Sequence, residues 1–327
     1  MYDVTVIGGG PVGQYAAYYS GLRGMKTKII DSLAQLGGQL SALYPEKYIF
    51  DVAGFPKIYA KDLVDQLTEQ MMQYEPSVCL NEKVTELVSN GEHVRLKTEK
   101  GGEHLSKTVI ISAGRGAFTP RKIDLARLDD LEGRGVHYFV TDKSALKGKK
   151  LLIVGGGDSA FDWALNLHGV ADSITLIHRT DQFRAHEDTV MKVMELDVKV
   201  HTFHELKALH GDDRVEGVTV YHNKTMEEQQ FEIDAVLMNL GFLANLGPIK
   251  QWGLSLKGNY IEVNSRMETN IPLVYGAGDG ITYDGKLPLI STGFGDAATA
   301  VNHAYALLHP GSRAFIHSSE SAGEKKH

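Results

Sequence analysis

Two glycine-rich loops of the same design constrain the fold of this chain more than any other feature. The first lies in IGGGPVGQYAA (7–17) and the second in VGGGDSAFDWA (154–164). Each loop follows a short apolar run and precedes a stretch of helical character, which is the order in which a strand–turn–helix unit binds the pyrophosphate of a dinucleotide. The repeat therefore predicts two dinucleotide-binding units in one chain.

The rest of the chain has the α/β rhythm that such units require. Short runs rich in Val and Ile indicate buried strands, and helix-length segments follow several of them, which is typical of parallel sheets with crossover helices. Between residues 83 and 113, alternating segments predict an antiparallel meander attached to the first sheet. Strands are expected at 4–7, 26–31, 107–112, 150–155, 173–178, 235–241 and 272–278, and helices at 12–23, 61–74, 158–168 and 186–196.

Composition favours a globular protein of two domains. The chain has 327 residues, whereas a single hydrophobic core stops growing at roughly 250 to 300 residues. No apolar run approaches the ~18 residues of a membrane span, and the strand at residues 2–7 leaves no room for a secretory signal. We therefore expect a soluble, cytoplasmic protein with no membrane partner. The net charge of −7 argues against a nucleic-acid partner.

The cysteine count limits the redox chemistry. Cys79 is the single cysteine, so one chain can hold neither an internal disulfide nor a dithiol centre. His201 and His204 have the H-x-x-H spacing, but no carboxylate and cysteine set nearby completes a metal site. We therefore expect no metal.

The first loop suits a dinucleotide that lacks a 2′-phosphate. Gly8, Gly10 and Gly13 satisfy G-x-G-x-x-G: the first permits a tight turn, the second a close approach to a pyrophosphate, and the third close packing of helix on strand. Asp31 ends the next strand, where a carboxylate accepts hydrogen bonds from a ribose diol and repels a 2′-phosphate. This site is predicted to bind FAD or NAD rather than NADP.

The second loop keeps the glycine pattern and reverses the charge. Where the first unit has Asp31, this unit has His178 and Arg179, followed by Arg184. Two arginine–phosphate hydrogen bonds, each about 1.5–3 kcal/mol, would favour NADPH over NADH by one to several powers of ten. Two nicotinamide sites would have no obvious redox use, so the prediction is FAD in the first site and NADPH in the second. The candidate NADPH residues of the loop itself are Gly155, Gly157, Asp158, Ser159 and Ala160.

With YGAGD (275–279) added, this layout resembles that of the low-molecular-weight thioredoxin reductases. The resemblance implies an α/β fold of two Rossmann-like dinucleotide-binding domains, each a three-layer ββα arrangement. It also implies that an NADPH-binding domain, 117–242, is inserted into a discontinuous FAD-binding domain, 1–116 and 243–327.

The chain departs from thioredoxin reductases at their Cys-x-x-Cys dithiol, because residues 137–140 read HYFV. A bacillithiol-disulfide reductase type would carry a cysteine in the first loop, where this chain has Val12. The match that remains is to the thioredoxin-reductase-like (type 2) ferredoxin–NADP reductases. The motifs that resemble that family are QLGGQLSALYPEKYIFDVAGFPKI (35–58), GGGDSAFDWAL (155–165), IHRTDQFRAHE (177–187) and STGFGDAATAVNHA (291–304).

This resemblance implies a set of flavin contacts. Tyr44 would stack on the isoalloxazine, and a C-terminal tail would cover the other face with His317, in a homodimer. A helix beginning near Thr292 would point its N-terminus at the flavin edge where negative charge accumulates, with Asp296 in its first turn as a capping carboxylate. Beside the three loop glycines, the implied flavin-binding residues are Asp31, Gln39, Tyr44, Val84, Phe118, Asp279, Thr292 and Ser319.

The function implied by the resemblance is electron transfer between NADPH and ferredoxin. NADPH would deliver a hydride to flavin N5, and single electrons would pass to the iron–sulfur partner; the reactive centre is the flavin, so no acid–base side chain is needed. Two alternatives stay open at this point. One is an NADPH oxidase or diaphorase that acts on oxygen, quinone or flavodoxin, and the other is a flavin- and NADPH-binding sensor without turnover.

Overall fold

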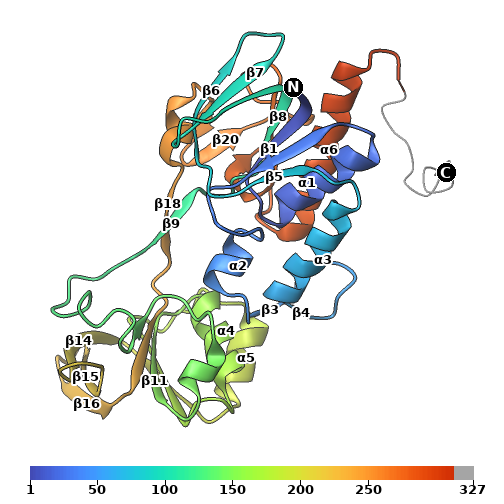
Figure 1. Ribbon diagram of the computed structural model, residues 1–327. Helices are drawn as coiled ribbons and strands as arrows, with labels where there is room; N and C mark the ends of the chain where they lie inside the picture. The colour runs from blue at the N-terminus through green and yellow to red at the C-terminus, as the bar shows by residue number, and fades with distance from the viewer. Residues whose placement is uncertain (313–327) are drawn as a thin grey trace. The chain divides into compact units, whose positions relative to one another are not determined.

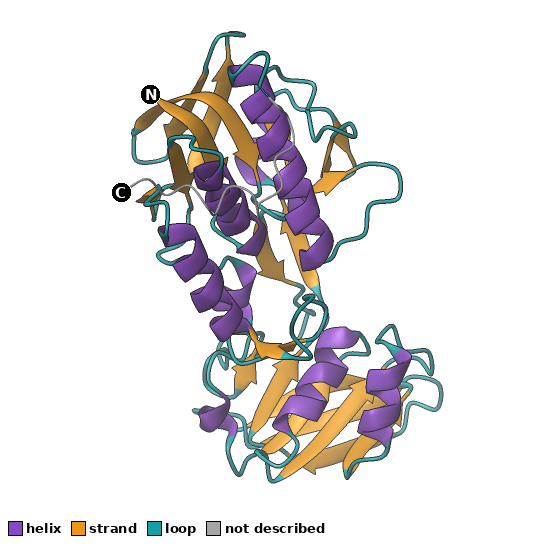
Figure 2. Cartoon of the chain, turned by 90° about the vertical axis from the view of Figure 1, so that its right-hand side faces the viewer, coloured by secondary structure: helices purple, strands orange, loops and turns teal. Residues whose placement is uncertain are grey.

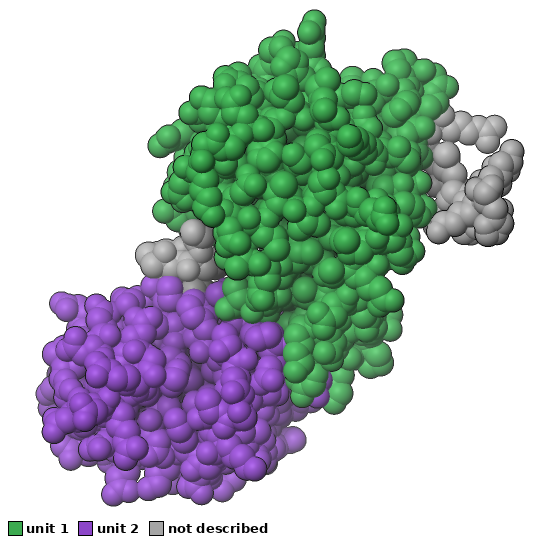
Figure 3. All heavy atoms as spheres, viewed as in Figure 1, with its two compact units in different colours: residues 1–42, 49–117, 244–327 green, residues 43–48, 118–243 purple. Residues whose placement is uncertain are grey.

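The computed structural model describes residues 1–312, apart from the side chains of 117–119 and 242–244. It divides into two compact units, which Figure 3 shows in different colours. Unit 2 comprises residues 43–48 and 118–243, and unit 1 comprises the rest. The chain therefore leaves unit 1 twice: once for the long insertion that the sequence predicts, and once for the short segment 43–48, which the sequence placed with the first domain.

Unit 1 is built on a seven-stranded sheet of order β5-β2-β1-β8-β7-β6, with β21 also paired to β8. These strands are β1 Tyr2–Ile7, β2 Thr27–Ile30, β5 Ser77–Cys79, β6 Val84–Ser89, β7 Val94–Thr98, β8 Glu103–Ile111 and β21 Val274–Gly276. The pairs β1–β2, β1–β8, β2–β5 and β8–β21 are parallel. Continuous apolar runs suit strands that are covered on both faces, and β1 and β2 are buried accordingly.

The antiparallel meander predicted between residues 83 and 113 is confirmed. β6 pairs β7 and β7 pairs β8 in antiparallel register. Burial alternates along β7: Val94, Leu96 and Thr98 are buried, and the residues between them are partly exposed. β8 is long enough to serve both as the last strand of the meander and as a strand of the parallel sheet, so the two halves are continuous.

Three helices pack in unit 1: α1 Pro11–Leu22, α3 Ala60–Met72 and α6 Ile290–Leu308. α1 and α6 lie side by side (Figure 1). Ala297, Ala300 and Ala304 are fully buried on α6, and such small side chains let two helices approach closely. The shorter elements of this unit and its borders are α2 Gln39–Leu43, β3 Tyr48–Ile49, β4 Ile58–Tyr59, η2 Gly247–Gln251, β19 Leu256–Lys257, β20 Tyr260–Glu262, η3 Gly278–Gly280 and β22 Ile281–Thr282.

Unit 2 has three layers, as predicted. Its central sheet is parallel, in the order β10 Val136–His137, β17 Ala235–Met238, β11 Lys150–Val154, β12 Ser173–His178 and β13 Val198–Thr202. Helices α4 Asp158–Leu167 and α5 Glu187–Met194 cover one face (Figure 2). An antiparallel sheet packs in a separate hydrophobic cluster with Leu152 and Val154 of β11. Its strands are β14 His204–His210, β15 Gly217–His222 and β16 Glu228–Glu232. The remaining element of this unit is η1 Lys143–Leu146. β9 Ala117–Pro120 and β18 Phe242–Asn245 pair with each other where the chain passes between the two units.

The period-two pattern of β11 produces these layers. Leu151 and Ile153 pack with Phe161 of α4, whereas Leu152 and Val154 pack with the residues of the antiparallel sheet. Because side chains alternate across a strand, one continuous apolar run buries both faces of the sheet. The predicted α/β fold of two Rossmann-like units is therefore confirmed. Within residues 1–312, no helix combines the length and apolar character that a membrane span requires.

Candidate functional site

The first glycine loop joins β1 to α1 and contains glycines of two kinds. A Cβ on Gly8 would lie 2.6 Å from the carbonyl oxygen of Ser112, and its φ of +108° favours glycine. A Cβ on Gly13 would lie 1.8 Å from the carbonyl oxygen of Gly8. A Cβ on Gly10, the N-cap of α1, would have Cα of Gly38 as its nearest neighbour, at 4.0 Å. Packing therefore requires Gly8 and Gly13, while Gly10 leaves room at a helix N-terminus, where anions bind.

Asp31 follows β2 and is 7% exposed. Its Oδ2 accepts the Gly9 N–H at 2.5 Å and its Oδ1 accepts the Leu33 N–H at 2.7 Å. Burial raises the pKa of this carboxyl, and the hydrogen bonds from Leu33 and Gly9 oppose that shift. The carboxylate thus orients the glycine loop, and because each oxygen has two lone pairs, it retains capacity to accept a ribose hydroxyl.

Val84 lies close to the Asp31 strand end. The Glu82 N–H donates to the carbonyl oxygen of Asp31 at 2.9 Å, and β6 begins at Val84 two residues later. The Val84 side chain is 6% exposed and belongs to the core of unit 1. Because its side chain is buried, Val84 could contact a ligand only through its backbone.

Close contacts between small residues bring distant segments to the first loop. A Cβ on Gly278 would lie 3.2 Å from Val12, and one on Gly293 of α6 would lie 2.4 Å from the same side chain. A Cβ on Gly280 would lie 2.2 Å from the carbonyl oxygen of Gly114. Asp279 and the N-terminal part of α6 are therefore held beside the loop that begins at Gly8, as the sequence predicts for one site.

One prediction about α6 needs correction. The helix begins at Ile290, near Thr292 as predicted, but Asp296 lies in its second turn and is not a capping carboxylate. The side chain of Asp296 is 3% exposed and pairs with Lys286, whose side chain is 6% exposed. Thr292 Oγ1 lies 2.7 Å from the carbonyl oxygen of Leu287. The sequence missed Lys286; the available signal was a carboxylate in a helix face of otherwise small residues, which requires a buried partner.

Gln39 and Tyr44, both predicted to contact the flavin, belong to different units. Gln39 begins α2 in unit 1, and its Nε2 lies 3.4 Å from the Cβ position of Gly114. Tyr44 belongs to unit 2, where it packs against the cluster that contains Phe161 and Trp163. The Phe118 side chain, His317 and Ser319 lie outside the described residues, so their predicted flavin contacts stay predictions.

The second glycine loop repeats the geometry of the first. A Cβ on Gly155 would lie 2.3 Å from the carbonyl oxygen of Asn239, while no atom of the described chain lies within 4 Å of the Cβ position of Gly157, the N-cap of α4. Ala160 is fully buried at the third position, and Ser159 is exposed. Asp158 Oδ1 accepts the His186 N–H at 2.9 Å. This loop also leaves room for a pyrophosphate at a helix N-terminus.

The cationic residues after β12 differ in their roles. A Cβ on Gly156 would lie 2.5 Å from the His178 ring, and the Arg184 N–H donates to the carbonyl oxygen of Gly156 at 2.7 Å. Burial lowers the pKa of His178, and Arg179 and Arg184 lower it further. The His178 ring therefore forms one wall of the loop, and its predicted contact with a 2′-phosphate stays a prediction. Arg179 and Arg184 are exposed, and neither guanidinium forms an ion pair within residues 1–312.

The segment 43–48 is fixed within unit 2 by polar contacts. Lys47 Nζ lies 2.5 Å from Asp162 Oδ2 of α4, and both side chains are 17% exposed. Glu46 Oε2 accepts the Lys143 N–H at 2.8 Å. The segment YPEKY is therefore part of the unit that carries the second glycine loop, a feature that no local sequence pattern indicates.

Lys47→Met is expected to loosen this segment. Losing a half-buried ion pair of about 1 kcal/mol should raise the population of the open segment about fivefold. Chymotrypsin cleavage after Tyr48, followed by mass spectrometry, measures that opening, since Pro45 protects the bond after Tyr44. Lys192→Met is the matched control, because its ion pair with Asp188 is exposed on both sides. Equal cleavage of the two variants would contradict the prediction.

Cys79, His201 and His204 all lie in strands. Cys79 ends β5, is partly buried and packs against the core of unit 1, and burial raises the pKa of its thiol. His201 and His204 contact each other, with ring centroids 5.3 Å apart. Within the described part of the chain, no group of three possible ligands could hold a metal ion.

Comparison with known proteins agrees with this geometry. The family model described as pyridine nucleotide-disulphide oxidoreductase matches residues 2–304. The chain is 51% identical over 316 residues to "Ferredoxin--NADP reductase 2" of Shouchella clausii, covering 96% of both chains. It is 51% identical to "Ferredoxin--NADP reductase" of Geobacillus thermodenitrificans, covering 96% of this chain and 95% of that protein.

Among solved structures, Lactococcus lactis thioredoxin reductase has a TM-score of 0.82 and 27% identity, covering 94% of this chain and 99% of the other. These similarities confirm the resemblance to thioredoxin-reductase-like ferredoxin–NADP reductases. The chain belongs to the pyridine nucleotide-disulphide oxidoreductase family.

Proposed function

We propose that this chain is an FAD-dependent oxidoreductase that passes electrons between NADPH and ferredoxin. The observation that carries the proposal is the pair of glycine loops, each of which leaves room at its second glycine. The strand after the first loop is followed by the anionic Asp31, whereas the strand after the second loop is followed by the cationic Arg179. The names of the relatives at 51% identity support ferredoxin as the partner.

Unit 1 has the features of an FAD site. The room at Gly10 fits a pyrophosphate at the N-terminus of α1, and Asp31 fits an adenosine ribose. Asp279 and α6 lie beside this loop, with Gln39 close to Gly114. When bound, FAD would supply the acceptance of a hydride and the release of single electrons, which side chains cannot perform.

Unit 2 has the features of an NADPH site. Gly157 leaves room for the pyrophosphate at the N-terminus of α4, with Asp158, Ser159 and Ala160 forming the first turn. Arg179 and Arg184 are free to bind a 2′-phosphate, since neither guanidinium forms an ion pair in the part of the chain that the structure describes. His178 shapes the loop from the side.

Disulfide reduction of the thioredoxin-reductase kind does not fit this chain. The fold matches that of Lactococcus lactis thioredoxin reductase, yet the sequence has one cysteine, and residues 137–140 read HYFV. A dithiol centre requires two thiols in one unit. The electrons of a bound flavin must therefore leave to an external acceptor.

The test follows cytochrome c reduction by the purified, flavin-loaded protein, with and without ferredoxin, and with NADH beside NADPH. We expect ferredoxin to raise the rate at least about tenfold and NADH to be a poor donor. Fast reduction of oxygen, quinone or flavodoxin without a ferredoxin effect would instead establish the oxidase or diaphorase alternative. Slow reduction by NADPH with every acceptor would favour the sensor.

The proposal extends to the setting of the reaction. We propose a cytoplasmic location, and the proposed reaction needs neither nucleic acid nor membrane as a partner. The homodimer rests on the family resemblance, because His317 and the tail lie outside the described residues. It stays a prediction.

A further inference from the structure

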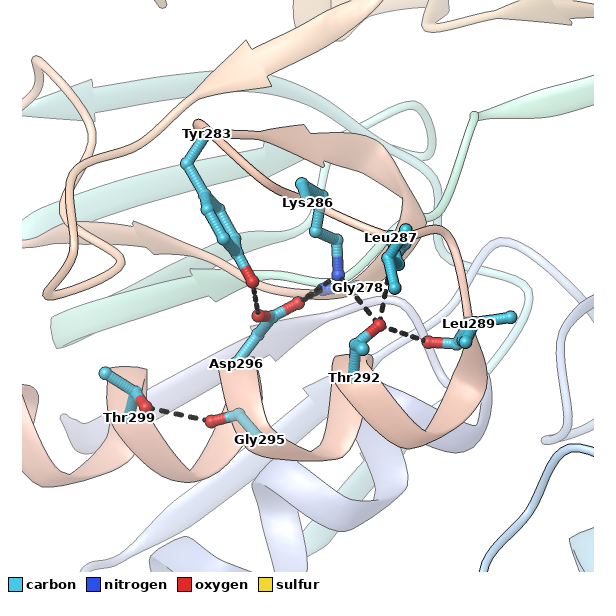
Figure 4. A network of polar contacts seen from close by, with 9 residues as sticks. All are labelled: Gly278, Tyr283, Lys286, Leu287, Leu289, Thr292, Gly295, Asp296 and Thr299. Carbon is cyan, nitrogen blue, oxygen red and sulfur yellow. Dashed lines mark hydrogen bonds and ion pairs between the residues drawn. The ribbon is translucent and has the colours of Figure 1, made fainter.

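A buried ion pair lies beside the candidate FAD site, between Lys286 and Asp296. The two charged atoms are 2.5 Å apart, and the side chains are 6% and 3% exposed. Figure 4 shows Lys286 reaching from the turn after β22 to Asp296 on α6. Tyr283 and Gly278 point at the same carboxylate.

Asp296 joins three segments of unit 1. Its Oδ1 accepts the Tyr283 hydroxyl at 2.9 Å, and its Oδ2 accepts the Gly278 N–H at 3.2 Å in addition to Lys286. Gly278 directly precedes Asp279, a predicted flavin ligand. The pair therefore ties the 283–289 turn, the Gly278–Gly280 turn and the second turn of α6 together at the site.

Packing stability alone does not explain this ion pair. The energy needed to remove two charges from water is often larger than their attraction, and apolar residues of similar size are frequently as stable. The neighbours on α6 are small and apolar, with Gly293, Ala297 and Ala300 buried around Asp296. A charge pair at this position therefore points to a role in the site.

The ammonium of Lys286 retains donor capacity. It donates to Asp296, and Thr292 Oγ1 lies 3.4 Å from it. An ammonium has three N–H groups. Among the residues that the structure describes, Thr292 Oγ1 and Asp296 Oδ2 are the two acceptors within hydrogen-bond distance. The positive charge of Lys286 also acts on Asp279, where it opposes the rise in pKa that burial causes.

We propose that Lys286 and Asp296 form a positioning pair that sets the reduction potential of a flavin bound in unit 1. Lys286 stabilises the negative charge that the bound ring gains when it accepts a hydride, that is, two electrons and one proton, as NADPH becomes NADP⁺. Asp296 holds Lys286 in place and weakens its field. This inference rests on the proposed function, because it assumes FAD in unit 1.

The test is the flavin midpoint potential of purified variants, measured by equilibrium titration with a reference dye. Lys286→Met leaves Asp296 uncompensated and should make reduction less favourable, whereas Asp296→Asn leaves Lys286 uncompensated and should make it more favourable. We expect each ratio of reduced to oxidised flavin to change about tenfold in opposite directions, equal to about 30 mV for a two-electron couple. The double variant should lie between the two.

Two further variants separate charge from structure. Lys286→Arg keeps the charge and should keep a potential close to that of the wild type, even if the geometry shifts. Lys107→Met is the matched control, because Lys107 forms an ion pair with Asp3 in the same unit in which the two side chains are 45% and 23% exposed. Solvent screens that pair, so its loss should leave the potential unchanged.

The outcomes distinguish this inference from the proposed function. A wild-type protein that does not bind FAD, or whose FAD is not reduced by NADPH, would refute the proposed function itself. If the wild type is reduced normally, shifts of the same sign in Lys286→Met and Asp296→Asn would overturn the inference, because loss of structure rather than charge would explain them. An unchanged potential in Asp296→Asn would overturn it as well.

Discussion

Replacing Arg179 and Arg184 together with glutamine is expected to lower kcat/KM for NADPH by about 100-fold or more, while kcat/KM for NADH changes less than about threefold. Each charge-assisted hydrogen bond to a phosphate contributes about 1.5–3 kcal/mol. NADH has no 2′-phosphate, so its binding does not depend on these hydrogen bonds. Steady-state kinetics with a saturating artificial acceptor measures both ratios. The substitution keeps most of the side-chain length, so the effect reports charge.

The structure makes this prediction sharper than the sequence did. Both arginines are exposed, and within residues 1–312 no carboxylate pairs with either side chain. Their removal therefore breaks no ion pair of the described chain, and the fold should be unaffected. Burial and the two arginines lower the pKa of His178. The arginines should therefore supply most of the discrimination between NADPH and NADH.

Arg214→Gln is the matched control for the double substitution. Arg214 is also an exposed arginine of unit 2, with a side chain 78% exposed and 3.9 Å from Glu216. Its loss should change neither cofactor by more than the error of the measurement. Equal losses for NADPH and NADH in the double variant would show that the 2′-phosphate is bound elsewhere.

The elements that the sequence predicted well depend on short-range patterns. Both glycine loops follow from spacing within one strand–turn–helix unit, and the apolar runs of β1 and β11 determine which strands are buried. The meander followed from the alternation in β7. Such patterns are local, so one sequence is enough to read them.

The segment 43–48 could not be placed from sequence. The family resemblance implies a flavin contact at Tyr44, but the assignment of the segment to unit 2 depends on contacts such as that of Lys47 with Asp162. These residues are far apart along the chain, and each alone is typical of a solvated surface. Nothing in YPEKY predicts which of two units will hold it.

Lys286 was missed for a related reason. Lysine is almost never fully buried unless paired, so nothing in YDGKLP distinguishes Lys286 from a surface lysine, and Asp296 was predicted as a capping carboxylate. Asp296 instead lies in the second turn of α6, where it is buried. The ion pair can be identified only when the position of α6 relative to the 283–289 turn is known.

Alanine at Gly10 should weaken FAD binding, whereas alanine at Gly13 should disrupt the fold. Gly10→Ala should fold normally and bind FAD about 100-fold or more weakly. The new Cβ meets no close protein atom in the described chain, since Cα of Gly38 lies 4.0 Å away. It does occupy the room into which a pyrophosphate would fit, and a steric conflict there costs about 3 kcal/mol.

Gly13→Ala should instead fail through the fold. Its Cβ would lie 1.8 Å from the carbonyl oxygen of Gly8 and 2.6 Å from Oγ of Ser112. The first neighbour is backbone, so α1 must move away from β1, and its contacts with α3 and α6 would move with it. We expect a loss of several degrees in thermal midpoint, or no folded protein, whatever the FAD concentration.

Two measurements on each variant distinguish these mechanisms: the thermal midpoint by far-UV circular dichroism, and the FAD dissociation constant from the flavin fluorescence released on dilution. Gly10 has φ −68° and ψ −179°, which alanine adopts without strain, so the stability of Gly10→Ala without FAD should match that of the wild type within about 1 kcal/mol. Wild-type FAD affinity in Gly10→Ala would show that no phosphate lies over this glycine. A thermal midpoint as low as that of Gly13→Ala would show that the room at Gly10 is needed by the protein itself.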